Sequence, residues 1–389
     1  MKTWNAYIKP FIHRHDLISA FLAMHIFILL FSNILANEKP LLCHCKSGWK
    51  FPAFHDYLYV LGLSMEDFEN YAACDHVVKA LIPFSSHTID PGASGYLPPF
   101  RKSPLTDHRH WLGTDALGRD VLSGLIDGTR TAWVIGLLAT LISMVPGVIL
   151  GLMAGYWRND RIRFSLASFF ILLPLISLLA YEFFAINGLI HSLILKSIVC
   201  IFFIALTVFM IYLISYKLQL GNRKYTFPLD HIIFRTIDAL ESIPKLFLLM
   251  SMIVFFARPS LISLILMIAL IRWSLFVIVT RSSTLKESVQ NYVISAKNLG
   301  VSDWKIMTYH IWPNIRSEVL VTAVYTFGAS ILLESTLSFI GLGLKLESVS
   351  WGSILNEGRQ YLPAWWLTVF PGITIFTLLW ALNRMITKK

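Results

Sequence analysis

Long apolar segments constrain this chain more than any other feature of its sequence. Several stretches of 17 to 26 residues contain at most one ionisable side chain, and a helix needs about 20 residues to cross about 30 Å of hydrocarbon. Only 14% of all residues are charged, against about 25% in soluble globular proteins. We therefore expect an all-α polytopic membrane protein with eight spans, at 16–36, 131–156, 164–186, 193–216, 241–257, 259–280, 318–340 and 365–385.

The first apolar segment is expected to be an anchor that is not cleaved. It is 21 residues long, whereas a signal peptide has an apolar core of roughly 7–15 residues followed by a small-x-small cleavage site. The candidate site, Ile34-Leu35-Ala36, begins with a large residue. Residues 1–36 are therefore predicted to form an N-terminal tail and a first span.

The distribution of basic residues predicts the orientation of the chain. With eight spans both termini lie on one side, where the segments hold 18 Lys and Arg in about 90 residues, against 12 in about 125 on the other side. Basic residues concentrate in cytoplasmic loops, so we expect both termini in the cytoplasm. This asymmetry accounts for the net charge of +10, and nucleic-acid binding is not needed to explain it.

Two segments between the predicted spans are long. Residues 37–130 are expected to form an extracytoplasmic segment whose proline-rich middle is irregular. Residues 281–317 form a predicted cytoplasmic loop of about 37 residues, which is longer than a connection between helices needs. The second loop is therefore a candidate functional element.

The pattern within 281–317 predicts two short helices. The first runs from Arg281 to Asn298 and is broken by Gly300; the second starts at Ser302 or Asp303, either of which can cap it, and stops before Pro313. The predicted apolar face of the first helix contains Tyr292, Val293, Ala296 and Leu299. Two short helices around a glycine can form a rigid segment that binds a soluble partner. An amphipathic helix that lies at the membrane surface without a partner is the alternative.

The chain contains no G-x-x-x-x-G-K-[ST] motif, the glycine-rich loop that binds nucleotide phosphates with backbone N–H groups. If ATP drives transport here, the ATPase is therefore another chain.

Four separated motifs resemble those of one family of transporters. Ala296, Gly300, Asp303-Trp304 and His310-Ile311-Trp312-Pro313-Asn314 are similar to the EAA loop of ABC importer permeases. LGTDALGRDVLSGLIDGTR at 112–130, ILLESTLSFIGLG at 331–343 followed by Ser350-Trp351-Gly352, and the set Asp238, Ser242 and Pro244 resemble the C-type subunit of dipeptide/oligopeptide/nickel permeases. Residues 35–41, LANEKPL, with Trp49 and Phe51-Pro52, resemble the YejE-like branch, which imports oligopeptides and peptide antibiotics of the microcin C type.

This resemblance implies a type I ABC importer transmembrane domain with six core spans, the first at 16–36 and the other five in residues 131–389, located in the bacterial inner membrane. It implies a pore-forming permease for di- or oligopeptides that has no cofactor of its own. The implied partners are a homologous B-type permease, two ATPases that bind ATP and Mg²⁺, and an extracytoplasmic peptide-binding protein. The residues implied to couple the permease to the ATPase are Tyr292, Ala296, Gly300, Asp303, Trp304, His310 and Pro313. Nickel or a peptide antibiotic as the cargo remains open.

The sequence departs from the family pattern in two respects. Ile294 replaces the glutamate that names the EAA loop, and Trp312 replaces the usual leucine before the proline, so contact with the ATPase is expected to differ. Two extra spans, within an inserted hairpin at 158–228, occupy the place of a short cytoplasmic loop. We expect this hairpin to pack on the lipid-facing side of the bundle.

Several residues inside the predicted spans are candidates for helix packing or for the pore. Gly147, Gly151 and Gly155 recur every four residues, a spacing that lets two helices approach closely. Ionisable residues at membrane depth usually face a bundle interior or a water-filled cavity. Glu334 is thus expected to line the pore or to make helix contacts, and pairing of Arg272 with a carboxylate is one alternative.

Three other classes of function find less support in the sequence. A secondary transporter is expected to show internal repeats and broken helices, which we do not find. The GASG motif around Ser94 resembles that of intramembrane proteases, but it precedes a proline-containing loop and lacks a nearby base. Cys43, Cys45 and Cys74, with neighbouring histidines, could bind a metal, although a disulfide from Cys74 to Cys43 or Cys45, or free thiols, is the preferred interpretation.

Overall fold

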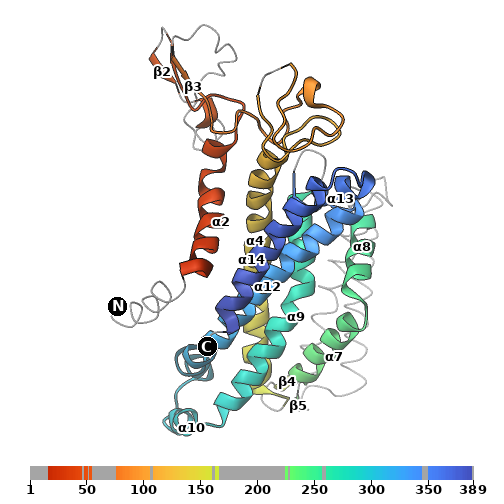
Figure 1. The fold of residues 1–389 in the computed structure, drawn as a ribbon. Helices are drawn as coiled ribbons and strands as arrows, with labels where there is room; N and C mark the ends of the chain where they lie inside the picture. The colour runs from red at the N-terminus through yellow and green to blue at the C-terminus, as the bar shows by residue number, and fades with distance from the viewer. Residues whose placement is uncertain are drawn as a thin grey trace, which may run out of the picture. The chain divides into compact units, whose positions relative to one another are not determined.

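The computed structural model describes residues 16–45, 48–50, 52–54, 76–105, 108–159, 163–165, 224–226, 228–255, 260–343 and 349–387, and it is mainly helical (Figure 1). The helices are α2 (Asp16–Leu35), α4 (Val121–Trp157), α7 (Leu229–Glu241), α8 (Lys245–Phe255), α9 (Leu261–Ser288), α10 (Asn291–Asn298), α11 (Asp303–Lys305), α12 (Trp312–Ile340), α13 (Trp351–Gln360) and α14 (Trp366–Thr387). Short turns of 3-10 helix form η1 (Pro52–Phe54) and η3 (Pro91–Ala93), and η4 (Ile306–Ile311) is π-helical.

The strands are short and lie in two small antiparallel sheets. One sheet has the order β2 (Gly48–Lys50), β1 (Leu42–Cys45), β3 (His76–Val78), with Cys43 opposite both Lys50 and Val77. The other pairs β4 (Arg163–Ser165) with β5 (Lys224–Thr226). Because β4 and β5 flank the predicted insertion, this pairing closes the ends of the inserted segment. The two inserted spans at 164–186 and 193–216 fall almost wholly outside the described residues.

The chain divides into two compact units. Unit 1 contains Met1–Val148, Glu241–Val279 and Arg316–Lys389, and unit 2 contains Ile149–Leu240 and Thr280–Ile315. The helices α4, α9 and α12 each contribute residues to both units. We describe the two units separately.

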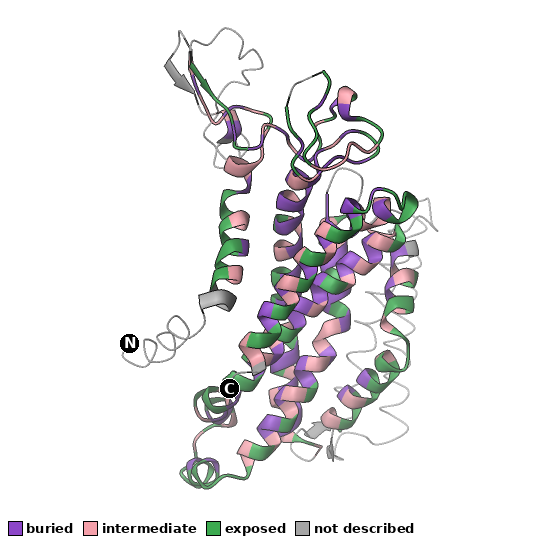
Figure 2. Cartoon of the chain, in the orientation of Figure 1, coloured by how far each residue is buried: buried purple, intermediate pink, exposed green. Residues whose placement is uncertain are grey.

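The core of unit 1 is built from two apolar clusters. One surrounds the fully buried Ile331 of α12, Trp351 of α13 and Leu367 of α14, and the other surrounds Leu264 and Ile268 on α9. The helices bury one side and expose the other (Figure 2). Trp351 also donates its Nε1 hydrogen to the Leu125 carbonyl at 3.1 Å, so this buried indole leaves no polar atom unsatisfied.

Most predicted spans are confirmed as apolar helices, with changed boundaries. Among the described residues, four segments are long and apolar enough to cross a membrane: Val121–Trp157, Leu261–Ser288, Asp303–Ile340 and Trp366–Ile386. α4 begins ten residues before the predicted start at 131, because an extension carrying Asp127 and Arg130 continues the same helix. The predicted span 241–257 is only partly correct, since α8 has 11 residues and Pro244 separates it from the amphipathic α7.

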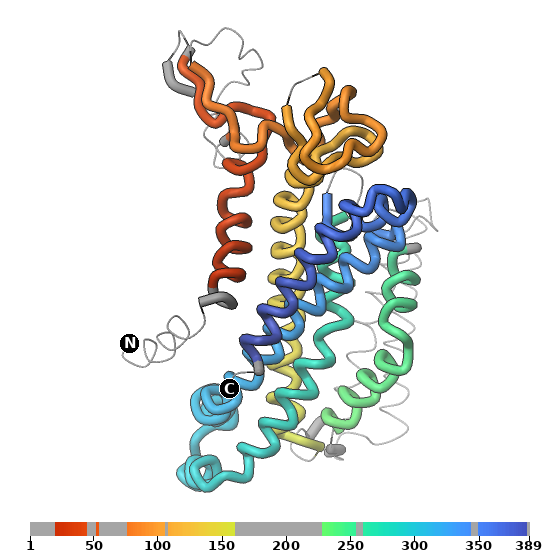
Figure 3. The backbone as a smooth tube through the Cα atoms, in the orientation of Figure 1, coloured from red at the N-terminus to blue at the C-terminus, as the bar shows by residue number. Residues whose placement is uncertain are grey.

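The prediction that a helix stops before Pro313 is wrong. α11, η4 and α12 follow one another without a break from Asp303 to Ile340, as the trace in Figure 3 shows. Proline lacks the N–H of the helical ladder and normally ends or kinks a helix. Here the π-helical η4 lies directly before Pro313, and its wider turn accommodates the proline ring and the missing donor within the continuous helix.

The predicted single helix from Arg281 to Asn298 is also wrong in detail. α9 ends at Ser288, and α10 begins at Asn291 after an extended residue, Gln290. Val293 and Ala296 of α10 are buried as expected, whereas Tyr292 and Leu299 are 37% and 83% exposed. The real apolar face is therefore narrower than the sequence pattern suggests.

Candidate functional site

A tight turn joins α10 to α11 in unit 2. The N–H of Gly300 donates to the Lys297 carbonyl at 3.0 Å, and the N–H of Val301 donates to the Ala296 carbonyl at 3.1 Å. Gly300 has a φ of +76°, in the left-handed region that glycine adopts without strain. This pair of bonds around a left-handed residue is a Schellman motif, so the helix break expected at Gly300 is present with a defined geometry.

The inner face of this hairpin segment, which we define as residues 291–311, is a small apolar core. Its buried members within unit 2 are Val293, Ala296, Ile306, Ile311 and Ile315, with Leu152, Tyr156, Val301 and Trp312 packed against them. The segment therefore packs on the end of α4 and the start of α12 as a structured element. A free amphipathic helix would show no such core.

Asp303 connects the hairpin segment to α4 by two hydrogen bonds. Its Oδ1 accepts from the Tyr156 hydroxyl at 3.0 Å, and its Oδ2 accepts from Trp157 Nε1 at 3.3 Å. Asp303 also lies in the first turn of α11, where a negative charge interacts favourably with the helix dipole. The sequence singled out Asp303 but not its two partners, because they lie about 146 positions away.

A second set of contacts joins the end of α9 to its neighbours in unit 2. Arg281 donates from Nε and Nη2 to the two oxygens of Asp230 at 2.5 and 2.6 Å, and its guanidinium lies 4.4 Å from the Phe234 ring centre. Asn314 donates to the Tyr292 hydroxyl at 2.9 Å. These polar bonds join α7 to α9 and α10 to α12.

The outer face of the hairpin segment is apolar and uncovered within the described chain. Its exposed large side chains are Tyr292 (37%), Ile294 (46%), Leu299 (83%), Trp304 (58%) and Tyr309 (75%). Of the other predicted coupling residues, Ala296 is buried, His310 is half-buried and Pro313 is exposed. Ile294, where the family motif has glutamate, belongs to this exposed surface. A rigid segment with exposed aromatic side chains has the features of a protein-binding surface.

The small residues of α4 lie against α9 in each unit. In unit 1, a side chain on Gly147 would come within 2.5 Å of Phe276 Cβ; in unit 2, one on Gly155 would come within 2.7 Å of Thr284 Cβ. Gly151 is buried. The glycine spacing is therefore explained by helix packing.

The two ionisable span residues have different surroundings in unit 1. Glu334 is fully buried and accepts hydrogen bonds from Ser338 at 2.7 Å and Ser335 at 3.3 Å, which places it in helix contacts of the subunit interior. Arg272 forms no ion pair with a described carboxylate and donates from Nη2 to the Ala329 carbonyl at 3.3 Å. The alternative of a carboxylate partner for Arg272 is therefore wrong within the described chain.

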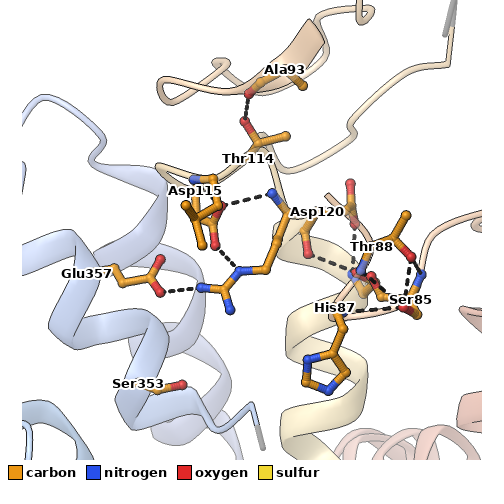
Figure 4. Close-up of polar contacts among 12 residues, drawn as sticks. Ser85, His87, Thr88, Ala93, Thr114, Asp115, Asp120, Ser353 and Glu357 are labelled. Carbon is orange, nitrogen blue, oxygen red and sulfur yellow. Dashed lines mark hydrogen bonds and ion pairs between the residues drawn. The ribbon is translucent and has the colours of Figure 1, made fainter. Parts of the chain in front are cut away.

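The 112–130 motif builds a polar cluster in unit 1 that the sequence did not predict. Arg119 donates to Asp115 at 2.5 Å and to Glu357 of α13 at 2.6 Å. Figure 4 shows the carboxylates of Asp115 and Glu357, each joined by a dashed line to a neighbouring side chain. Thr114 donates to the Ala93 carbonyl at 2.7 Å. Burial and the nearby charge of Asp115 raise the pKa of Glu357 to about 7, while Arg119 lowers it.

A buried histidine reinforces the same loops. His110 lies between Asp120, 2.8 Å from its Nδ1, and Asp90, 3.3 Å from its Nε2. Burial alone would lower the pKa of His110, but the hydrogen bonds and charges of the two carboxylates raise it above its usual value. A protonated imidazole balances part of the negative charge in this buried cluster.

The structure gives no support to the protease and metal alternatives at the residues it describes. Ser94 is exposed, and its Oγ donates to the Pro91 carbonyl at 2.9 Å. Cys43 is buried, and the disulfide alternative stays a prediction. The side chains of Cys45 and Cys74 lie outside the described residues. No group of three or more metal-ligating side chains occurs among the residues that were described.

Comparison with known proteins shows what this architecture resembles. Residues 218–389 match the family described as the inner membrane component of binding-protein-dependent transport systems. The chain is 27% identical to the di/tripeptide transport system permease protein DppC of Pseudomonas aeruginosa over 71% of this chain and 69% of DppC. It is 27% identical to the inner membrane ABC transporter permease protein YejE of Escherichia coli, over 91% of this chain and 85% of YejE. Over these stretches the chain is similar to permeases of binding-protein-dependent transport systems.

A third relative extends the range of cargoes. The glutathione transport system permease protein GsiD of Pectobacterium atrosepticum is 26% identical over 71% of this chain and 69% of GsiD. The type I ABC importer fold and the multi-pass membrane location predicted from the sequence are therefore confirmed. In this permease, the hairpin segment carries the EAA-like motif. Permeases of this family work with ATPase and substrate-binding proteins.

Proposed function

We propose that this permease is a pore-forming subunit of an importer for short peptides, driven by ATP hydrolysis in a separate ATPase that binds the hairpin segment. The observation that carries the proposal is the combination of a rigid inner face with an uncovered aromatic outer face in residues 291–311. A segment that transmits movement must be stiff, and a segment that binds a partner must expose apolar surface. The hairpin segment has both properties.

The proposed complex contains this chain, a homologous B-type permease, two ATPases and an extracytoplasmic peptide-binding protein. ATP and Mg²⁺ bind to the ATPases, and the permease contributes no catalytic group. Both termini and the hairpin segment face the cytoplasm, in agreement with the excess of Lys and Arg on that side. Residues 37–130 then face the binding protein, and residues 131–389, together with the start of α4 from Val121, form the transmembrane domain.

The proposed mechanism is a shift between two conformations of the complex. When ATP brings the two ATPases together, their clefts move the two hairpin segments. The Asp303 bonds to α4 and the continuous helix from α11 to α12 carry this movement into the spans. ATP shifts the equilibrium between the two conformations only as far as the outward-open conformation fits the closed ATPases better than the other conformation does.

Peptides are the proposed cargo because DppC is named for di- and tripeptides and GsiD for glutathione, itself a tripeptide. The similarity to YejE covers 91% of the chain and so includes the N-terminal part of the chain that resembles the YejE-like branch. A peptide antibiotic therefore remains the second candidate cargo, and uptake assays with both peptide classes separate the two.

Cysteine crosslinking tests the proposed contact. In a cysteine-free background, Leu299→Cys places a thiol on the most exposed apolar residue of the hairpin segment, and Leu362→Cys places one on a residue of similar exposure (80%) beside α14. We expect only the first to crosslink to the co-expressed ATPase. Equal yields at both positions, or none at Leu299→Cys in an inserted protein, would contradict the proposal.

A further inference from the structure

Arg272 is a cation in the middle of a membrane-spanning helix. It lies on α9, eleven residues after the helix begins, and α9 is one of the four candidate spans. Charged side chains at membrane depth are costly and occur where they face protein or water and bind a partner. We therefore expect Arg272 to bind a partner.

Among the described residues, Arg272 has only a weak interaction partner. Arginine has five N–H donors, and among the described residues the one hydrogen bond to this side chain is the 3.3 Å contact from Nη2 to the Ala329 carbonyl. Its Nε is buried and has no acceptor in the part of the chain that the structure describes, and no carboxylate there forms an ion pair with it. Glu241 is engaged with Ser274 at 2.9 Å and with Lys245 at 3.5 Å. Arg272 as a whole residue is only partly buried.

The helix face beside Arg272 is more polar than the other exposed span faces. On α12, the spacing of Glu318, Tyr325, Ala329, Leu332 and Thr336 puts them in one stripe, in which Glu318, Tyr325 and Leu332 are exposed. Tyr325 is 59% exposed. By contrast, the exposed large residues in the middle of α4 are all aliphatic, namely Leu137, Leu138, Leu141, Ile142, Val145 and Ile149. An aliphatic face suits lipid, and a face with a carboxylate, a phenol and an arginine beside it suits water.

We propose that Arg272 is a cargo-binding residue of the translocation path and that its ligand is the C-terminal carboxylate of the peptide. This inference rests on the proposed function. Every unmodified linear peptide carries this carboxylate, whatever its side chains, so one guanidinium serves many peptides. The planar guanidinium matches a carboxylate in two-point hydrogen bonding. A single such contact also allows release, which transport requires.

The test compares dialanine with dialanine amide in cells that express the complete transporter. The amide lacks the negative charge but keeps the size of the peptide. Because all strains contain the same binding protein, its own preference cancels when the acid-to-amide uptake ratio is compared between permease variants. The variants are Arg272→Gln, Arg272→Lys and, as a matched control, Arg384→Gln, which removes an exposed arginine near the end of α14.

We expect Arg272→Gln to lower dialanine uptake at least tenfold and amide uptake less than twofold, Arg272→Lys to be intermediate, and Arg384→Gln to match wild type. Equal loss of both peptides, with reduced co-purification of the second permease, would show that Arg272 pairs with that subunit and would overturn the inference. Unchanged dialanine uptake by Arg272→Gln would also overturn it, leaving the proposed function intact. If the wild-type transporter accumulates no peptide, the proposed function itself fails, and this inference with it.

Discussion

Two regions of the permease use left-handed glycines for different ends. Gly118, in the loops of the 112–130 motif, has a φ of +87°, and a side chain there would overlap the Asp90 carbonyl oxygen. Gly300, in the hairpin segment, has a φ of +76°, and a side chain there would meet nothing within 4 Å. The loops around Gly118 pack tightly against one another. The surroundings of Gly300 are open and leave room for contact with another protein.

The polar side chains of the two regions also differ in where they lie. Around Gly118, His110, Asp120 and Asp90 are buried together, and Arg119 bridges two carboxylates. In the hairpin segment, Asp303 makes its hydrogen bonds to α4 at part-buried positions, and the exposed surface includes the large apolar and aromatic side chains of Ile294, Leu299, Trp304 and Tyr309. The first region is built for stability, and the second is built to present a surface while remaining stiff.

The largest expected effect is that of Gly118→Ala. A left-handed alanine is strained by roughly 1–2 kcal/mol, and overpacking against the Asp90 carbonyl adds about 1–3 kcal/mol, so we expect a loss of about 3 kcal/mol in unfolding free energy. Gly95→Ala is the matched control, because Gly95 has a φ of +84° but open surroundings. Thermal unfolding of the purified complex measures both. If the two variants were equally stable, the crowded surroundings of Gly118 would have no effect on stability, and the prediction would be wrong.

Gly300→Pro is expected to affect transport more than stability. Proline has a φ near −65° and no N–H, so it cannot form the Schellman turn that Gly300 makes with Lys297. We expect peptide uptake to fall at least tenfold while the protein still inserts in the membrane, as judged by uptake assays and by the amount of membrane-extracted protein. Normal uptake by this variant would be incompatible with a rigid coupling turn.

The raised pKa of Glu357 predicts a pH dependence confined to unit 1. Its pKa of about 7 in the folded protein lies above the ordinary value of 4.5, so its contribution to stability is fully present below pH 4.5 and is lost as the pH rises to 7. We expect wild type to lose on the order of 2 kcal/mol relative to Glu357→Gln across this range. Unfolding measured from pH 4.5 to 8 tests this. Glu318→Gln, which changes an exposed residue, serves as the control. If the stability of wild type and of Glu357→Gln changed in parallel with pH, the prediction would be contradicted.

The smallest expected effect is on the Asp303 contact. Asp303→Ala removes the acceptor of two hydrogen bonds at part-buried positions, so we expect a stability loss of about 1 kcal/mol. Tyr156→Phe removes one of the two bonds and should have about half this effect. Hydrogen exchange in residues 291–311 is the local readout. Unchanged exchange in both variants would mean that the segment is stiffened by its apolar core alone.

The sequence predicted what depends on local pattern. The spans 131–156, 259–280 and 318–340 were recognisable because hydrocarbon requires long apolar helices, and the break at Gly300 because few other residues tolerate its conformation. The continuation of the helix through Pro313 was missed, since the π-helical turn that permits it leaves no clear sequence signal. The roles given to the candidate coupling residues stay predictions.

Contacts between distant parts of the chain could not be derived from the pattern. Arg281 pairs with Asp230 across 51 positions, and Arg119 pairs with Glu357 across 238. Many carboxylates were available to each arginine, and only the packing of the helices selects one. Arg272 shows the converse, because its position made a carboxylate partner plausible and the described chain provides none.

The central claim is that the hairpin segment is moved by an ATPase that is a separate chain. Reconstitution in liposomes tests it most directly, with labelled dialanine and the binding protein on one side and either ATP or an ion gradient as the energy source. We expect the complete transporter to accumulate dialanine with ATP, and this permease alone to accumulate none under either condition. Accumulation by the permease alone, driven by an ion gradient, would contradict the account.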